Sequence, residues 1–179
     1  MELVEPIAIN TKLNNKKDLR ESLQILQTWF SPSFPVGSFS FSHGLEAMIN
    51  DKLLKSKDDI LDYLKCILKH GTGKNDIILI KYTYRGEELN ELALSLCASK
   101  ERKIESIEMG NSFRKVLADS WNFKIPENTS YQIAVGKAAK HFNLPLNLTI
   151  ISYLQSFAVN LINVCIKHIP IGQKLGKTV

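Results

Sequence analysis

Apolar residues recur every three to four positions along most of the chain, which is the spacing of helices that bury one face. The first such segment places Leu19, Leu23, Leu26 and Phe30 on one face, and Pro32 predicts its end. The same spacing predicts further helices after Ser56, over 89–97, from about Lys100 to Trp121, after Thr129, and from Pro145 to about His168.

Capping signals mark two of the predicted helix starts. Ser56 and Asp59 have the spacing of an N-terminal capping pattern, and Thr129 with Gln132 is expected to form a capping box. The helix predicted from about Lys100 to Trp121 carries one stripe along its length: Ser106, Gly110, Phe113 and Leu117. For the helix after Thr129, the expected buried face consists of Val135, Ala138, Ala139 and Phe142.

One segment is also compatible with a strand. Residues 77–80 form a short apolar run, and Tyr82, Thr83 and Tyr84 follow it with β-forming side chains. A single strand would have no evident partner in this chain, so we interpret the segment as a buried helix. These patterns predict an all-α, single-domain helical bundle over 18–179, preceded by a flexible N-terminal arm, 1–17.

Composition and charge narrow the class of protein. Of the 179 residues, 44% are hydrophobic and 23% are charged, which is ordinary globular usage. The formal net charge is +5, and the basic residues are interleaved with Asp and Glu. A dedicated nucleic-acid binder would gather its basic residues on one face. A basic helical nucleic-acid-binding module, or another interaction module, is therefore the alternative interpretation and not the leading one.

The cysteines and the apolar stretches indicate a compartment. The three cysteines lie far apart and form no close pair, which favours a reducing environment. The N-terminal segment lacks the continuous apolar stretch of a signal peptide. No uncharged apolar stretch reaches the roughly 18 residues that span a bilayer. We expect a cytoplasmic protein without a membrane segment.

The sequence contains no complete catalytic, nucleotide or metal motif. Gly73 and Lys74 resemble the end of a phosphate loop, but Leu68 and Asn75 replace its first glycine and its Ser or Thr. Two Cys–His pairs each offer two ligands, fewer than a closed zinc-type site needs: Cys66 with His70, and Cys165 with His168. We expect no catalytic residue, no cofactor and no metal site within one chain, although a site shared across a dimer would escape this test.

The segment 31–46 combines a rigid backbone with polar side chains. Its prolines and Gly37 define turns, and Phe39, Phe41 and Leu45 are expected to anchor it in the core. Polar residues lie between the anchors: Ser40, Ser42, His43 and Glu46. From these properties alone the segment is interpreted first as a rigid interhelical corner and second as a recognition surface.

The last predicted helix is apolar nearly all round except for one narrow polar stripe. At about 100° per residue, the stripe comprises Ser152, Ser156, Asn160, Asn163 and Lys167. A helix with so little polar surface is either central to the fold or docked against another chain. The stripe is then a plain solvent-facing edge or a contact surface.

At the segment 31–46 and in the last predicted helix, the sequence resembles the UreF family of urease accessory proteins. Residues 31–46 resemble the family signature SP-x-x-PVG-x-FS-x-S-x-GLE almost position for position. Further matches follow in order: Lys100 to Ser106 with Met109 and Gly110, then 134–139, then Tyr153, Leu154, Asn160, 170–173 and Gly176. Together these matches span most of residues 20–177.

The resemblance implies an all-helical scaffold that forms a homodimer and has no catalytic activity of its own. Family members bind UreH, also called UreD, and the GTPase UreG, and the assembly docks on apo-urease to couple GTP hydrolysis to nickel insertion. UreF is held to modulate the GTPase. The chain ends at Val179, whereas the family continues into a tail used in binding UreH, so 18–179 is interpreted as a UreF-like domain lacking that tail.

The resemblance also suggests where partners bind. Lys167 resembles a basic position just before the family's PLGQ motif, and it ends the polar stripe. We expect it to contact UreG, where its positive charge would stabilise a phosphate or an acidic surface. The other candidates are Asn160 and Asn163 on the stripe, Ser40, His43 and Glu46 in the segment 31–46, and Gln173 near the end of the chain.

Overall fold

The computed structural model describes residues 18–37 and 42–168, and this part of the chain is helical without a strand. The predicted arm, 1–17, lies outside the described residues. The all-α prediction is confirmed, and the ambiguous segment 77–84 lies inside a helix. In chain order the helices are α1 (Leu19–Trp29), α2 (Leu45–Asn50), α3 (Lys57–Lys69), α4 (Thr72–Arg85), α5 (Asn90–Ser95), α6 (Lys100–Trp121), α7 (Tyr131–His141) and α8 (Leu146–His168).

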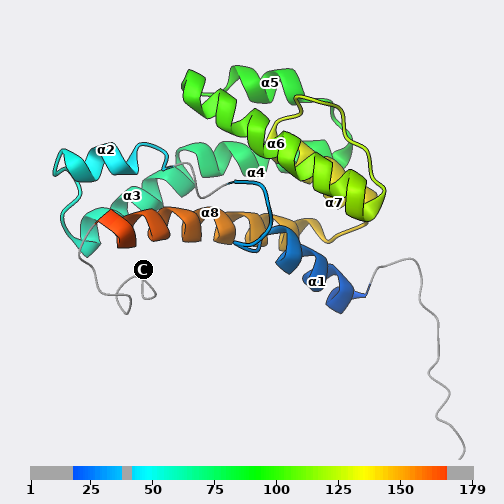
Figure 1. Ribbon diagram of the computed structural model, residues 1–179, viewed down its shortest axis with the longest axis horizontal. Helices are drawn as coiled ribbons and strands as arrows, with labels where there is room; N and C mark the ends of the chain where they lie inside the picture. Colours follow the sequence, from blue (N-terminus) through cyan, green and yellow to red (C-terminus); the bar gives the residue numbers. More distant parts are fainter. Residues whose placement is uncertain (1–17, 38–41, 169–179) are drawn as a thin grey trace, which may run out of the picture.

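Helix α8 forms one long side of the molecule. Figure 1 shows α1 near its N-terminal end and α2 and α3 near its C-terminal end, with α4 above it. It contacts each of these four helices, while α7 packs against both α4 and α6. The expectation that no apolar stretch reaches membrane-spanning length is wrong for α8: among the described helices it alone is long and apolar enough by length and composition, with a mean hydropathy of 1.5 in an 18-residue window within Leu146–Lys167. Of that window 28% is buried within the described fold, so the contacts with four helices account for only part of its apolar character.

The main hydrophobic core contains an aromatic cluster in which Trp29 of α1 meets Phe113 of α6. Trp29 and Phe113 are fully buried there, with their ring centroids 5.3 Å apart in an edge-to-face arrangement. Ser106, Gly110, Phe113 and Leu117, the stripe on the long helix, are all buried on α6. On α7 the predicted face is buried at Val135, Ala138 and Ala139, and Phe142, just beyond the helix, is partly buried.

Helix α1 buries only part of the face that its apolar spacing predicts: Leu26 is fully buried and Phe30, just after the helix, is partly buried. Leu19 is 57% exposed and Leu23 is 38% exposed. Ser22 and Trp29, which lie beside the predicted face, are buried together with Leu26. The helix is rotated so that Trp29, its largest side chain, faces the core, because burying the indole removes more apolar surface from water than burying either leucine.

One of the two capping predictions is confirmed and the other is wrong. Ser56 Oγ accepts from the Asp59 N–H at 3.1 Å, and Asp59 Oδ2 accepts from the Ser56 N–H at 2.9 Å, which completes the capping box of α3. At α7 the N-cap is Ser130, without a side-chain cap. The side chain of Gln132 is instead buried and accepts a hydrogen bond from Ser106 at 2.9 Å. Tertiary pairing with α6 replaces the local cap because a buried amide must be satisfied.

Two glycines allow α7 to lie close to its neighbours. A Cβ at Gly110 of α6 would collide with the Thr129 carbonyl oxygen, just before α7. A Cβ at Gly136 of α7 would lie 2.9 Å from Cβ of Thr83 on α4. These contacts hold α4 and α6 on either side of α7, and α4 and α6 supply Asp76, Arg102 and Glu105 of the polar network described below.

Candidate functional site

The polar stripe of α8 is partly accessible. Ser152, Ser156 and Asn160 are half-buried, whereas Asn163 and Lys167 are exposed. The N-terminal side chains of the stripe are therefore partly covered by neighbouring residues, and its last two side chains lie at the surface. Its last two side chains are free to contact another molecule, as the sequence prediction requires, and their role stays a prediction.

The structure brings the start of the segment 31–46 next to this stripe. A groove of about 350 Å³ separates the two. One wall includes Phe30, Ser31 and Pro32 at the end of α1, and the other includes Ser156 and Asn160 of α8. The two sequence features therefore lie on opposite sides of a single groove, although they are more than a hundred residues apart in sequence.

Of the three anchors that the sequence predicts in the segment 31–46, Leu45 lies in the described part and is buried, whereas Phe39 and Phe41 lie outside it. Phe34, Val36 and Leu45 are buried, and the ring of Phe34 contacts that of Phe113 with a centroid separation of 5.7 Å. Glu46 is exposed in the first turn of α2. Residues 38–41 and 169–179 lie outside the described part, and with them Ser40, Phe39, Phe41 and Gln173.

His43 points into the molecule rather than toward a partner. Its backbone is left-handed, with φ of 51°, and it leads directly into α2. Its side chain is only 10% exposed; Nε2 lies 3.2 Å from the Glu105 carboxylate, and the ring packs edge-on against Phe157. The Tyr63 hydroxyl donates to the His43 carbonyl at 2.9 Å. This placement favours a structural role, and a partner contact by His43 stays a prediction.

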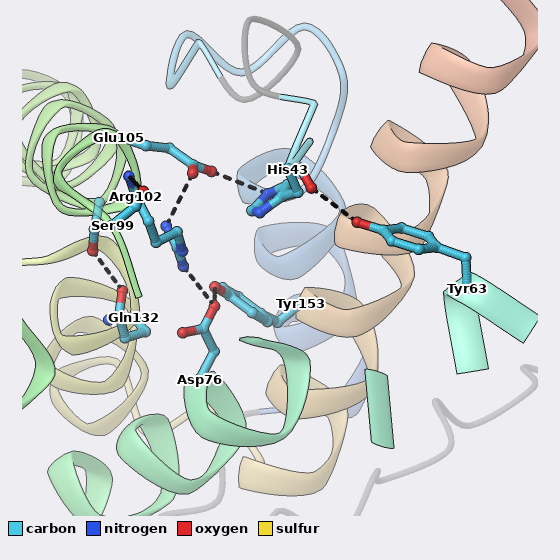
Figure 2. A network of polar contacts seen from close by, with 9 residues as sticks. His43, Tyr63, Asp76, Ser99, Arg102, Glu105, Gln132 and Tyr153 are labelled. Atoms are coloured by element: carbon cyan, nitrogen blue, oxygen red, sulfur yellow. Dashed lines mark hydrogen bonds and ion pairs between the residues drawn. The ribbon is translucent and has the colours of Figure 1, made fainter. Parts of the chain in front are cut away.

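The His43–Glu105 pair is one end of a buried polar network (Figure 2). Arg102 lies one helical turn before Glu105 on α6, and its guanidinium is 3.4 Å from the Glu105 carboxylate. The same guanidinium donates to Asp76 of α4 at 3.0 Å. The Tyr153 hydroxyl of α8 donates to the same Asp76 oxygen at 2.6 Å. The network therefore joins α4, α6, α8 and His43, two residues before α2.

Burial controls the protonation of this network. Removal from water raises the pKa of Asp76, and the Arg102 charge and the Tyr153 hydrogen bond oppose that shift. Burial also raises the pKa of Tyr153 well above its ordinary value. Tyr153 is therefore a protonated donor at neutral pH, which matches its hydrogen bond to Asp76.

The chemistry of this network suits structure better than catalysis. Asp76, Glu105 and Tyr153 are buried, and their polar atoms contact one another or Arg102 and His43. A catalytic acid or base must reach a substrate proton. In the residues that the structure describes, no three His, Cys, Asp or Glu side chains are placed to hold a metal ion. What the arrangement does is hold four segments of the chain in one relative position.

Sequence reasoning did not single out Asp76, Glu105 or Tyr153 as parts of one site. Asp76 carried a usable signal, because at helical spacing it shares a face with Ile80 and Thr83, both of which are buried. A carboxylate on a buried helix face requires a partner. The identity of that partner, Arg102, 26 residues away, was not accessible from spacing within one helix.

Comparisons with known proteins agree with the structure. The UreF family model matches residues 54–179. Urease accessory protein UreF of Roseobacter denitrificans is 34% identical over 159 residues, covering 86% of this chain and 71% of the relative. Urease accessory protein UreF 1 of Brucella canis is 36% identical over 167 residues, covering 87% and 73%. The protein of this name from Ruegeria pomeroyi is 35% identical over 160 residues, covering 86% and 73%.

These matches include the α8 stripe, most of the polar network and the helices that carry them, since the family model begins before α3 and continues past α8. The resemblance seen in the sequence motifs is thereby confirmed over most of the described fold. The chain belongs to the UreF family of urease accessory proteins.

Proposed function

We propose that this protein is a non-catalytic scaffold of urease maturation that joins UreH (UreD) and the GTPase UreG for GTP-dependent nickel insertion into apo-urease. The observation that carries the proposal is the groove between α1 and α8, where the segment 31–46 begins opposite the polar stripe. A half-polar groove beside exposed polar side chains is suited to protein recognition. Nickel is the cargo of this process, and the GTPase supplies the nucleotide chemistry.

Within this surface, Lys167 and Asn163 are the proposed contacts to UreG, with Asn160 beside them. Lys167 is exposed at the C-terminal end of α8, and a lysine there is compatible with the helix dipole. Its positive charge would meet an acidic or phosphate-bearing surface and modulate the GTPase. Glu46 is a second proposed contact, and Ser40, His43 and Gln173 complete the set.

A homodimer and a cytoplasmic location belong to the same proposal. Large apolar side chains are exposed on α1 and α8, among them Leu19, Leu23 and Ile151. A second copy of the chain would remove such surface from water. The reduced state of Cys66, Cys97 and Cys165 is compatible with the cytoplasm.

Size-exclusion chromatography with light scattering tests the scaffold. The protein is run alone and then with UreH, UreG and GTP, and we expect one complex containing all three proteins. The Lys167→Ala variant should retain UreH and lose most of the UreG, whereas Lys124→Ala, at an exposed lysine between α6 and α7, should behave as wild type. Equal UreG recruitment by wild type and Lys167→Ala would refute the role of Lys167, and absence of any complex would refute the scaffold.

A further inference from the structure

A second groove lies between α4 and α5 and shares no residue with the α1–α8 groove or the polar stripe. We call it the α4–α5 groove. It has a volume of about 310 Å³ and is lined mainly by apolar side chains: Ile78, Leu79, Tyr82, Leu89, Leu92 and Leu96. Figure 1 shows α5 at the edge of the molecule opposite α8. A partner in this groove would therefore leave the α8 surface free.

The walls of the groove expose large apolar side chains from both helices. Ile78 and Tyr82 of α4, with Leu92 and Leu96 on α5 and at its end, are between 37% and 51% exposed. Beneath them Leu79 packs in a buried cluster with Ala93 and Ile133. Singly exposed leucines are ordinary, but apolar side chains gathered on both walls of one groove mark an interaction site.

Helix α5 is fixed in place from behind. The Asn90 side chain donates to the Asn128 carbonyl at 3.1 Å and accepts from the Ser130 N–H at 2.8 Å. In the linker before α5, Glu88 pairs with Lys137 of α7 at 2.6 Å. The wall that carries Leu92 and Leu96 is thus ordered before a partner binds, which lowers the entropy cost of docking.

The two rims of the groove carry opposite charge. Lys74, Lys81 and Arg85 follow one another at helical spacing along the outer edge of α4, beside Ile78. Glu87, just after α4, lines the groove, and Glu91 is exposed in the first turn of α5. The groove therefore has an apolar floor between one basic and one acidic rim.

We propose that the α4–α5 groove binds an amphipathic helix of a partner protein. Such a helix presents apolar side chains at i, i+3 or i+4, and i+7 to a groove of this kind. The rims select acidic residues along the edge that meets α4 and basic residues along the edge that meets Glu87 and Glu91. A second copy of this chain would offer the same concave surface, and two concave surfaces do not fit together as a groove and a convex helix do.

Fluorescence anisotropy with the full chain tests this proposal. The probe is a labelled synthetic peptide of about 15 residues, with Leu at the apolar positions, Glu along one edge and Lys along the other. We expect Leu92→Ser and Leu96→Ser each to weaken binding about tenfold. The control Leu53→Ser, at a leucine 65% exposed after α2, should bind as wild type. Equal binding by all four proteins, or by a peptide with scrambled Leu positions, would overturn the proposal.

Charge exchange tests the rims separately. The double variant Glu87→Lys with Glu91→Lys should lose affinity for the mixed-edge peptide and gain affinity for a peptide with Glu on both edges. An unchanged preference would overturn the assignment of the rims.

Light scattering on the protein without peptide tests whether a second copy of the chain occupies the groove. If Leu96→Ser converts a wild-type dimer to a monomer, a second copy covers the groove and the proposal is wrong.

Discussion

At the scale of single residues, Arg102 holds the network together. It neutralises two buried carboxylates, those of Asp76 and Glu105. We expect Arg102→Met to lower the free energy of unfolding by about 3–5 kcal/mol, because it leaves both carboxylates buried without a cation. Urea unfolding followed by circular dichroism measures this loss. The control is Arg114→Met, whose partner Glu127 is largely exposed; it should cost about 1 kcal/mol or less, and equal losses would contradict the prediction.

A second prediction at the scale of single residues concerns Asp76 and the pH dependence of stability. Burial raises its pKa in the folded state, so its contribution to stability is present below the unfolded value of about 3.9 and is lost as the pH rises through the folded pKa. Asp76→Asn removes this titration. Wild type should therefore lose stability relative to Asp76→Asn as the pH rises from about 4. Chemical denaturation of both proteins across pH measures the difference, and a wild-type advantage that grows with pH would refute it.

At the scale of one element, the capping box sets the start of α3. Ser56→Ala should lower the free energy of unfolding by about 1 kcal/mol.

The same capping box gives a prediction for pH dependence. The N–H groups of Lys55 and Ser56, with the Ser56 hydroxyl, lower the pKa of Asp59. The contribution of Asp59 to stability is therefore present above the unfolded pKa of about 3.9 and is lost as the pH falls through the folded pKa. The melting-temperature gap between wild type and Asp59→Asn should therefore shrink from pH 7 toward pH 3. Asp58→Asn, at an exposed carboxylate in the same turn, should show no such gap.

The close contact at Gly110 of α6 predicts how a substitution there changes stability. Gly110→Ala would force a Cβ against the Thr129 carbonyl oxygen, and backbone on both sides cannot yield as a flexible side chain does. We expect a loss of about 1–3 kcal/mol or more, although alanine is normally the better helix former. Thermal unfolding measures the loss. The control Ser120→Ala, exposed on the same helix, should be near neutral, and a stabilised Gly110→Ala variant would refute the close approach.

At the scale of the whole molecule, the helices that the structure describes should unfold together. Helix α8 contacts α1, α2, α3 and α4, and α7 links α4 to α6. The buried Trp29 reports on the core, while circular dichroism reports on all helices. We therefore expect tryptophan fluorescence and circular dichroism to give the same urea midpoint. Two separate midpoints would show that part of the bundle unfolds independently.

The sequence by itself determined the local features of this protein. Helical spacing predicted the bounds of α6 and its buried stripe, and the Ser56–Asp59 pattern predicted the start of α3. These features depend on residues within one or two turns of each other, so short-range spacing is sufficient to detect them. The family motifs are also read along the chain, and family membership was accessible from them.

Only the tertiary structure decided which faces and polar groups meet. It rotated α1 to bury Trp29, paired Gln132 with Ser106, and turned His43 inward to Glu105. It also placed residues of α1 and α8 on one groove, and residues of α4 and α5 on another. Helical periodicity states that a face is buried or exposed, but the burial energy that selects its partner depends on residues far away in the sequence, which meet only when the helices pack.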